Sequence, residues 1–502
     1  MNTLAHQKVL VLGLGASGLA MVRWCVRQGA LVTVADTRAA PPQLAVLLET
    51  LPDVAFVQSA FDAGLIEGTG FQAVFVSPGL APHQTQDVVL AAQATGLWVG
   101  GELALFAQAL ADLKETQQYQ PQVLAITGTN GKTTVTSLTG HLFDWIDRPV
   151  AVAGNIGPTL LDTLTQALDT QALPQVWVLE LSSFQLEFAS GFSPTAATVL
   201  NITQDHLDWH GSMQDYARAK SHVFGSHGVM VLNRDDAQVM AMLPAPVKGR
   251  AARDWLSFGT DMPQRPGDFG LEEVNGMVWL VRALEADETQ KRKKGSEAEE
   301  LHFQRLMPAD ALRIRGRHNA SNALAALALC TSTGAALGPL LFGLREYRGE
   351  PHRVQPIGIL NAVEFFDDSK GTNVGATVAA LTGLGEERKV VVILGGEGKG
   401  QDFAPLAEPV SRYARAAVLI GRDAALIRAA LEHSGVPLAD AVSMEDAVAQ
   451  ANQRAHAGDA VLMSPACASF DMFDNYEHRA RVFAAAVEEL AQSAGNSLEV
   501  TA

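Results

Sequence analysis

The stretch TGTNGKTT, Thr127–Thr134, carries the residue types of a phosphate-binding loop. The common pattern is G-x-x-x-x-G-K-[ST], in which backbone N–H groups and the lysine bind phosphate oxygens and the hydroxyl binds Mg²⁺. Here Ile126 replaces the first glycine, and Gly128 stands only three residues before Gly131. The spacing predicts a shortened nucleotide-phosphate loop with Lys132 as its cation and the next threonine as a metal ligand.

The segments on both sides of this loop favour the same interpretation. The apolar run VLAIT precedes it and has the composition of a buried strand, whereas VTSLTGHLFDWI follows it with the periodicity of a helix. The simpler alternative is a Gly-Asn turn with a surface lysine. That alternative does not explain why a strand and a helix meet at this loop.

Other side chains of the kind that bind metals follow in the sequence. Glu180 ends the apolar run VWVLE, and its carboxylate can hold a metal ion, or it can be an ordinary capping or ion-paired acid. The stretch TQDHLDWHGS brings together Asp205, His206, Asp208 and His210. The two histidines are spaced as a zinc pair on a helix, but the cysteines offer no zinc-ligand spacing. A role for His206 with a hard metal near the nucleotide is the more consistent hypothesis.

The glycine-rich turn GLGASG, Gly13–Gly18, follows the expected strand Lys8–Leu12 and precedes a helical pattern. Asp36 stands at the end of the next expected strand, Leu31–Ala35. Glycines at such a turn let a ligand approach the backbone closely, and the helix amino terminus attracts an anion. Taken alone, the turn suggests a dinucleotide-binding dehydrogenase, or it serves only for packing.

Length and composition limit the alternatives. The chain has 502 residues, 48% of them hydrophobic and 18% charged, which indicates a globular protein of two to four domains. The formal net charge of −17 argues against nucleic acid as a partner. The scattered cysteines Cys25, Cys330 and Cys467 favour a reducing compartment. Neither a signal peptide nor a membrane span is expected, so the sequence predicts a cytoplasmic protein without a membrane partner.

Strand and helix patterns alternate along the whole chain, which predicts an α/β fold with three domains in series. We expect these domains at 1–112, 113–348 and 349–502. The polar stretch Leu113–Pro121 is a candidate linker. The segment Ala286–Glu300 is rich in both charges and predicts an exposed loop; its KRKK run forms a weak basic patch at most, because neighbouring glutamates cancel its charge.

Several motifs together resemble the Mur ligase family, which adds amino acids to the bacterial cell-wall precursor. TGTNGKTT, GNIG, ELSSFQL, DHLD, the helix with Lys220 and RGRHNASNALAA resemble the central ATPase domain of this family and of the related folylpolyglutamate synthases. DDSKGTNVGAT (Asp367–Thr377) and SPACASFDMFDNYEHRA (Ser464–Ala480) resemble the members that add D-glutamate. The central region Val247–Leu312 is longer than in the family pattern, which leaves the domain edge open there.

The resemblance implies a Rossmann-like first domain that binds the UDP of the substrate rather than NAD, a central P-loop ATPase-like domain, and a Rossmann-like carboxyl-terminal domain. The positions that match contacts to the UDP-substrate are Ser17, Asp36, Thr37, Arg38, Gly79, Asn155, Ser182, Gln185 and His206. The positions that match the acceptor amino-acid pocket are Thr372, Lys399, Ser469, Phe470 and Tyr476. At the position of Tyr476 the family pattern has phenylalanine.

The resemblance also implies ATP, Mg²⁺ ions at two sites, and carbamylation of Lys220, a residue that pattern alone describes as a surface lysine of a helix. The ATP positions are Gly128, Thr129, Asn130, Gly131, Lys132, Thr133, Thr134, Asn319, Asn322, His352, Arg353 and Asp368. The implied metal ligands are Thr133, Glu180, His206 and the carbamylated Lys220. The implied catalytic residues are Lys132, His206, Lys220 and Lys370.

The implied reaction begins when the terminal carboxylate of UDP-N-acetylmuramoyl-L-alanine attacks the γ-phosphate of ATP. The amine of D-glutamate then attacks the acyl phosphate, and phosphate leaves. A monomer that acts on small molecules is the expected form. Three alternatives remain at this point: another amide ligase of the Mur or folylpolyglutamate synthase type, an NAD-dependent dehydrogenase, which gives Lys132 no role, and a nucleotide-regulated binding module without chemistry.

Overall fold

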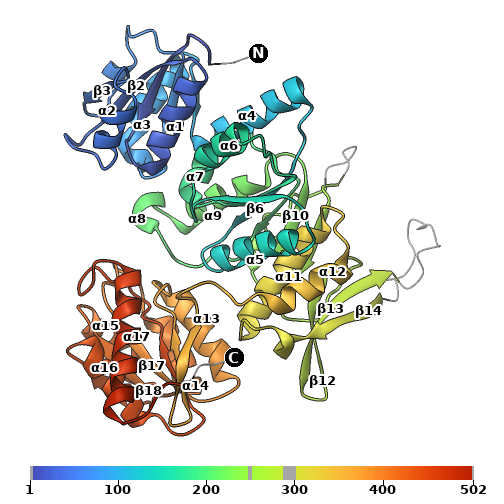
Figure 1. The fold of residues 1–502 in the computed structure, drawn as a ribbon, viewed down its shortest axis with the longest axis vertical. Coiled ribbons are helices and arrows are strands. Elements are labelled where there is room, and N and C mark those ends of the chain that lie inside the picture. Colours follow the sequence, from blue (N-terminus) through green and yellow to red (C-terminus); the bar gives the residue numbers. More distant parts are fainter. Residues whose placement is uncertain (1–3, 247–251, 286–300, 500–502) are drawn as a thin grey trace.

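The structure of the chain is a computed structural model that describes residues 4–246, 252–285 and 301–499. It contains three α/β domains in series, as the sequence predicts (Figure 1). The predicted charged loop at 286–300 lies outside the described residues, and the division at 112/113 and 348/349 stays a prediction. Within the described ranges, no helix combines the length and the apolar character needed to cross a membrane.

The first domain is built on a five-stranded parallel sheet with helices against its faces. Its strands, in spatial order, are β3 (Ala55–Gln58), β2 (Leu31–Asp36), β1 (Lys8–Leu12), β4 (Ala73–Val76) and β5 (Trp98–Gly100). Its helices are α1 (Ala16–Arg27), α2 (Leu44–Thr50) and α3 (Pro82–Ala94). Because β1 and β4 are neighbours, the strand order reverses between them, and the loops that follow these two strands meet at a place where α/β sheets bind ligands.

Helix α4 (Glu102–Gln117) connects the first domain to the second, and it corrects the predicted linker. The helix continues through the first part of Leu113–Pro121 and ends only where Gln118 adopts a left-handed backbone with φ 57°. The stretch LKETQ is polar, but lysine, glutamate and glutamine are all good helix formers. Its polarity therefore reflects exposure to solvent rather than a loop.

The central domain contains a six-stranded parallel sheet and a smaller antiparallel sheet. The parallel strands, in spatial order, are β11 (Trp255–Phe258), β10 (Val229–Asn233), β9 (Ala196–Val199), β6 (Gln122–Thr127), β8 (Val176–Glu180) and β7 (Val150–Gly154). Strands β12 (Phe269–Val274), β13 (Met277–Glu285) and β14 (Leu301–Pro308) form the second sheet, which projects from the side of the domain (Figure 1). The helices are α5 (Lys132–Trp145), α6 (Leu160–Asp169), α7 (Ser183–Glu187), α8 (Leu207–His210), α9 (Met213–Ser221), α10 (Ala237–Met240), α11 (Arg317–Thr331) and α12 (Leu337–Glu346).

The third domain has a six-stranded sheet in which only the edge hairpin β15–β16 is antiparallel. In spatial order the strands are β15 (Gln355–Leu360), β16 (Val363–Asp367), β20 (Ala460–Met463), β17 (Val390–Gly395), β18 (Ala414–Ile420) and β19 (Leu438–Asp440). The helices are α13 (Val374–Gly385), α14 (Ala407–Tyr413), α15 (Ala424–Leu431), α16 (Met444–Arg454) and α17 (Tyr476–Ser493). Strands β16, β20 and β17 are neighbours and run parallel, so the motifs that follow them all lie at the carboxyl-terminal ends of the strands.

Candidate active site

The phosphate loop lies between β6 and α5, as its sequence predicts. Gly128 and Gly131 have φ values of 150° and 82°, and a Cβ atom on Gly128 would lie 2.9 Å from Leu200 Cβ, so both positions need glycine. Lys132 is the first residue of α5, and its Nζ donates hydrogen bonds to the carbonyl oxygens of Gly128 and Thr129, both at 2.8 Å. The lysine therefore folds back over its own loop, with its charge directly above the expected phosphate position.

Lys220 lies beneath the same loop and is not the surface lysine that its pattern alone suggests. Its side chain is buried, its Nζ donates to Gly128 O at 2.9 Å, and it lies 4.6 Å from the centre of the Tyr216 ring. In the described part of the chain its amine forms no ion pair. Burial, reinforced by the nearby charge of Lys132, lowers the pKa of Lys220 well below its ordinary value. A neutral amine is therefore favoured at this position.

Glu180, the last residue of β8, faces the loop with a buried carboxylate. Its Oε1 accepts a hydrogen bond from Asn155 Nδ2 at 2.8 Å, whereas its buried Oε2 has no hydrogen-bond partner among the described residues. A buried carboxylate oxygen without a partner is costly, and a hard cation bound by oxygen ligands would satisfy it. The donor set at Glu180 therefore fits Mg²⁺.

His206 and His210 both pack against the Phe184 ring, but their polar contacts differ. His206 Nε2 lies 3.5 Å from Asp205 Oδ2, and its ring packs edge-on against Phe184. His210 Nε2 instead lies 2.8 Å from Ser183 Oγ. Among the residues that the structure describes, no three His, Cys, Asp or Glu side chains gather as metal ligands, so the zinc interpretation gains no support.

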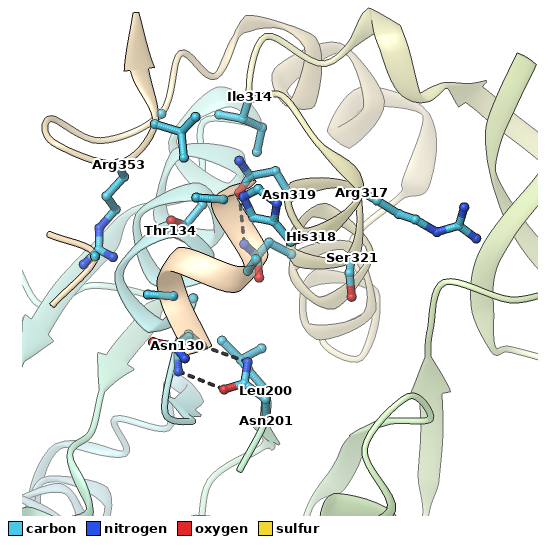
Figure 2. A pocket seen from close by; sticks show the side chains of 18 of the residues that line it. Asn130, Thr134, Leu200, Asn201, Ile314, Arg317, His318, Asn319, Ser321 and Arg353 are labelled. Atoms are coloured by element: carbon cyan, nitrogen blue, oxygen red, sulfur yellow. Dashed lines mark hydrogen bonds between the residues drawn. The ribbon is translucent and has the colours of Figure 1, made fainter. Parts of the chain in front are cut away.

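Two adjoining cavities lie between the central and the carboxyl-terminal domains. The larger one, of about 670 Å³, is lined by many of the predicted site residues, namely Thr129, Asn130, Gly131, Lys132, Thr133, Asn155, Glu180, His206, His352, Arg353, Lys370, Thr372 and Tyr476. The smaller one, of about 360 Å³, is shown in Figure 2; its predicted lining residues are Asn130, Gly131, Thr134, Asn319, Asn322, Arg353, Asp368 and Lys370. The two cavities share Asn130, Gly131, Arg353 and Lys370 in their lining.

The carboxyl-terminal side of these cavities comes from the motif that follows β16. Asp368 is buried; its Oδ2 accepts from Ser464 Oγ at 2.6 Å and its Oδ1 from Val354 N at 3.2 Å. Burial raises the pKa of Asp368 to about 7, although these two hydrogen bonds act to lower it. Lys370 Nζ lies 3.9 Å from the centre of the Tyr476 ring. The aromatic ring predicted for the acceptor pocket therefore contacts a predicted catalytic lysine.

Some predicted site residues are not brought to either cavity. Lys399 Nζ lies 5.6 Å from the centre of the exposed Phe470 ring, and neither residue lines the two cavities. Ser469, which precedes Phe470 in the sequence, is buried and is also absent from the lining of both cavities. Ser182 and Gln185, which were predicted for the UDP-substrate site, line neither cavity and form a capping box at the start of α7. The acceptor pocket predicted from sequence is therefore only partly assembled at the cavities.

Asn373 and Glu350 are among the residues that line the cavities without having been predicted from the sequence. Asn373 Nδ2 donates to Asn130 Oδ1 at 3.0 Å and ties the third domain to the phosphate loop. Glu350 lines both cavities and accepts from the Tyr347 hydroxyl at 2.9 Å. Asn373 belongs to the quoted motif DDSKGTN, so its position there was a usable signal, whereas nothing in the spacing around Glu350 marks it.

In the first domain, the expected uridine-diphosphate residues surround the carboxyl ends of β1, β2 and β4. Asp36 Oδ2 accepts from Leu14 N at 2.8 Å, and Arg38 donates from Nε and Nη2 to the two Asp36 oxygens at 2.9 and 2.8 Å. Burial by itself raises the pKa of Asp36, but the hydrogen bonds and charge of Arg38 outweigh it and lower the value to about 2. Arg38 is half exposed, so this rim presents a cation at the glycine-rich turn.

Comparison with known families gives matches in all three domains. The matching models are the Mur ligase MurD-like N-terminal domain over residues 7–101, the Mur ligase middle domain over 126–330 and the Mur ligase glutamate ligase domain over 352–467. Two solved structures share the fold over nearly the whole chain, at 20% and 15% sequence identity. These are UDP-N-acetylmuramate-alanine ligase from Thermotoga maritima (TM-score 0.52; 97% of this chain and 100% of that one) and MurF ligase from the same organism in complex with ADP (TM-score 0.56; 98% and 97%).

Curated relatives match at much higher identity. The chain is 70% identical to UDP-N-acetylmuramoylalanine–D-glutamate ligase of Albidiferax ferrireducens, with 99% of each chain covered. It is 57% identical to the protein of the same name from a Polaromonas species, with 99% of this chain and all of the other covered. Together with the phosphate loop, the buried lysine beneath it and the domain order, these matches show that the chain belongs to the Mur ligase family.

Proposed function

We propose that this chain is an ATP-dependent ligase that joins D-glutamate to UDP-N-acetylmuramoyl-L-alanine in the synthesis of the peptidoglycan precursor. One observation carries the proposal: the larger cavity brings Lys132 and Glu180 of the central domain together with Lys370 of the D-glutamate-type motif. The names of the curated relatives support the same activity, and the ADP complex of the solved relative supports ATP as the nucleotide.

The first step needs cations, because a carboxylate must approach the triphosphate. Lys132, Lys370 and Arg353 all line the larger cavity and offset this repulsion. Arg353 and Lys370 also line the smaller cavity, where Asn319, Asn322 and Asp368 hold the adenosine part of ATP. The carboxylate oxygen then bonds to the γ-phosphorus, and ADP leaves.

Thr133 and Glu180 hold one Mg²⁺ in this proposal, and His206 and a carbamylated Lys220 hold the second. Bound Mg²⁺ neutralises charge on the phosphate oxygens. The first metal site is supported by Glu180 Oε2, which is buried and has no hydrogen-bond partner among the described residues. Carbamylation is supported by the lowered pKa of the buried Lys220 amine, because only an uncharged amine adds CO₂. Carbamylation converts this neutral amine into an anion that can pair with a metal ion.

In the second step the amine of D-glutamate attacks the acyl phosphate carbonyl. Thr372 and Tyr476 line the cavity and would face the acceptor there. Lys399, Ser469 and Phe470 complete the pocket only if the third domain moves relative to this structure, so we propose that substrate binding draws that domain toward the phosphate loop.

We also propose that the protein works as a cytoplasmic monomer on small molecules, with no nucleic acid or membrane partner. The formal net charge of −17 supports the lack of a nucleic-acid partner. The buried, unpaired cysteines Cys25, Cys330 and Cys467 support a reducing compartment.

Phosphate release across a grid of nucleotide-sugar peptides and amino acids tests the function. We expect release only when ATP, UDP-N-acetylmuramoyl-L-alanine and D-glutamate are all present, with the ligated product identified by mass spectrometry. Folate acceptors and titration with NADH serve as controls for the folylpolyglutamate synthase and dehydrogenase alternatives. Release driven by a folate acceptor, or tight NADH binding at the glycine-rich turn, would contradict the proposal.

A further inference from the structure

Glu102 is a buried carboxyl at the junction of the first two domains. It is the first residue of α4, and only 2% of its surface is exposed. Its Oε1 accepts from Leu161 N at 3.1 Å in the first turn of α6, whereas its buried Oε2 has no hydrogen-bond partner among the described residues. Ser17, in the first turn of α1, is near enough for its hydroxyl to interact with this carboxyl and lower its pKa. The starts of three helices from two domains therefore meet at one acid.

The surroundings of Glu102 oppose its charge. Burial raises the pKa of Glu102 to about 7, against the lowering effects of the Leu161 N–H and the Ser17 hydroxyl. Asp162 of α6 raises the pKa of Glu102 further, and Arg23 of α1 lies 3.6 Å from Asp162. Glu102 thus changes charge near neutral pH, and it forms no ion pair with any side chain in the described ranges.

We propose that Glu102 is a positioning residue for the UDP-substrate and that it acts through Ser17. In the ionised form, the orphan oxygen of Glu102 attracts the Ser17 hydroxyl hydrogen away from the ligand. In the protonated form, Glu102 donates its own proton to Ser17 Oγ, so that the Ser17 hydroxyl hydrogen is free to bind a diphosphate oxygen. The inference rests on the proposed function, because Ser17 belongs to the proposed diphosphate site.

When the diphosphate binds above the pKa of Glu102, Glu102 takes up a proton from solvent, because its protonated form favours diphosphate binding. Two other charged groups of the site do not titrate between pH 6 and 9. The pKa of Asp36 is lowered to about 2, and that of Arg38 is raised above its already high value by Asp36. Above the pKa of Glu102 we therefore expect the dissociation constant to rise by up to about tenfold for each pH unit.

Isothermal titration calorimetry tests this with UDP-N-acetylmuramoyl-L-alanine as the probe, without ATP or Mg²⁺, from pH 6 to 9. The carboxylate and diphosphate groups of the probe titrate below this range, and two buffers of different ionisation enthalpy report the number of protons taken up. We expect uptake to approach one proton per site above pH 8 in the wild type. For Glu102→Gln, which keeps a donor to Ser17, we expect no uptake linked to this site and an affinity at pH 8.5 close to that of the wild type at pH 6.

Ser17→Ala is the second variant, and it keeps the test valid if the glutamine variant folds poorly. It should bind more weakly at pH 6 and should lose most of the pH dependence. If the dissociation constant of either variant depends on pH as strongly as that of the wild type, the proposed role of Glu102 is wrong, even when both variants bind the probe. A wild type that fails to bind the probe at any pH contradicts the proposed function instead, so the two failures are distinguishable.

Discussion

Arg353 Nη2 donates a hydrogen bond to Thr133 Oγ1 at 2.6 Å and thereby joins residues that stand 220 positions apart. Thr133 belongs to the phosphate loop, whereas Arg353 belongs to the connection that leads into the third domain. Arg353 also lines both cavities, so its charge lies where the nucleotide phosphates are proposed to pass from one cavity to the other. The phosphate loop is therefore completed by a cation from outside its own domain.

Arg353→Ala should reduce phosphate release by about 10²–10³-fold at saturating substrates, the loss typical for removal of one donor that stabilises transition-state charge. Arg353→Lys should recover only part of the rate, because lysine keeps the charge but not the planar fork of donors. Initial-rate assays with all three substrates measure both effects. A rate for Arg353→Ala within twofold of the wild type would show that Arg353 has only a structural contact with Thr133.

Lys132→Ala should abolish acyl-phosphate formation while the UDP-substrate still binds, because Asp36 and Arg38 lie in a separate domain. Positional isotope exchange in ATP, measured without D-glutamate, reports the first step alone. Lys114→Ala, on the exposed end of α4, is the matched control and should exchange like the wild type. Normal exchange in Lys132→Ala would remove the lysine from the first step.

Lys220→Ala should be inactive, and small carboxylates such as formate or acetate should partly restore its activity by replacing the missing anion. The lowered pKa of Lys220, caused chiefly by burial, favours its neutral amine, which is the form that adds CO₂. Labelling with ¹³C-bicarbonate should give a carbamate signal in the wild type only. Wild-type turnover of Lys220→Ala in CO₂-free buffer would leave this lysine with a packing role alone.

Lys399→Ala should raise the KM for D-glutamate by about tenfold or more, with little change in the KM for ATP, since the proposed role of Lys399 is to hold the α-carboxylate. Lysine and diaminopimelate should be rejected, because each places a cation beside hydrogen-bond donors, and an unpaired buried charge is costly. Competition among mixed D- and L-amino acids with product analysis checks this. The acceptor assignment is falsified if the product contains lysine or diaminopimelate.

Glu102→Gln should raise the melting temperature at pH 8.5 by at least about 2 °C, the shift that about 1 kcal/mol gives in a domain of 150–250 residues. The folded-state pKa of Glu102, about 7, lies above the ordinary value of 4.5, so its protonated form favours folding. That stabilisation is complete at low pH and is lost as the pH rises through 7. The difference between the variant and the wild type should therefore shrink at pH 5, as thermal melts in matched buffers would show.

Sequence reasoning succeeded where local pattern determines structure. VLAITGTNGKTTV specifies β6, the loop and the start of α5, because strand composition, glycine backbone requirements and helix periodicity all act within a few residues. The strands β1 and β2 were predicted for the same reason. The helix through Leu113–Gln117 was missed because exposed helix ends and loops have similar polar compositions.

The remaining features depend on contacts between distant segments, which spacing does not encode. The burial of Lys220 depends on the phosphate loop lying above α9, so its pattern alone indicated the wrong environment. The bond from Asn373 to Asn130 requires a particular angle between two domains. Lys399 and Phe470 lie away from both cavities even though their motifs were identified.

The connection between α12 and β15 contributes Glu350, His352 and Arg353 to the larger cavity. A chimaera that exchanges acceptor specificity between two ligases must therefore be joined before residue 347, so that the connection travels with the third domain. A crossover at β15, the first strand of the third domain, would combine Arg353 from one parent with the loop that carries Lys370 from the other.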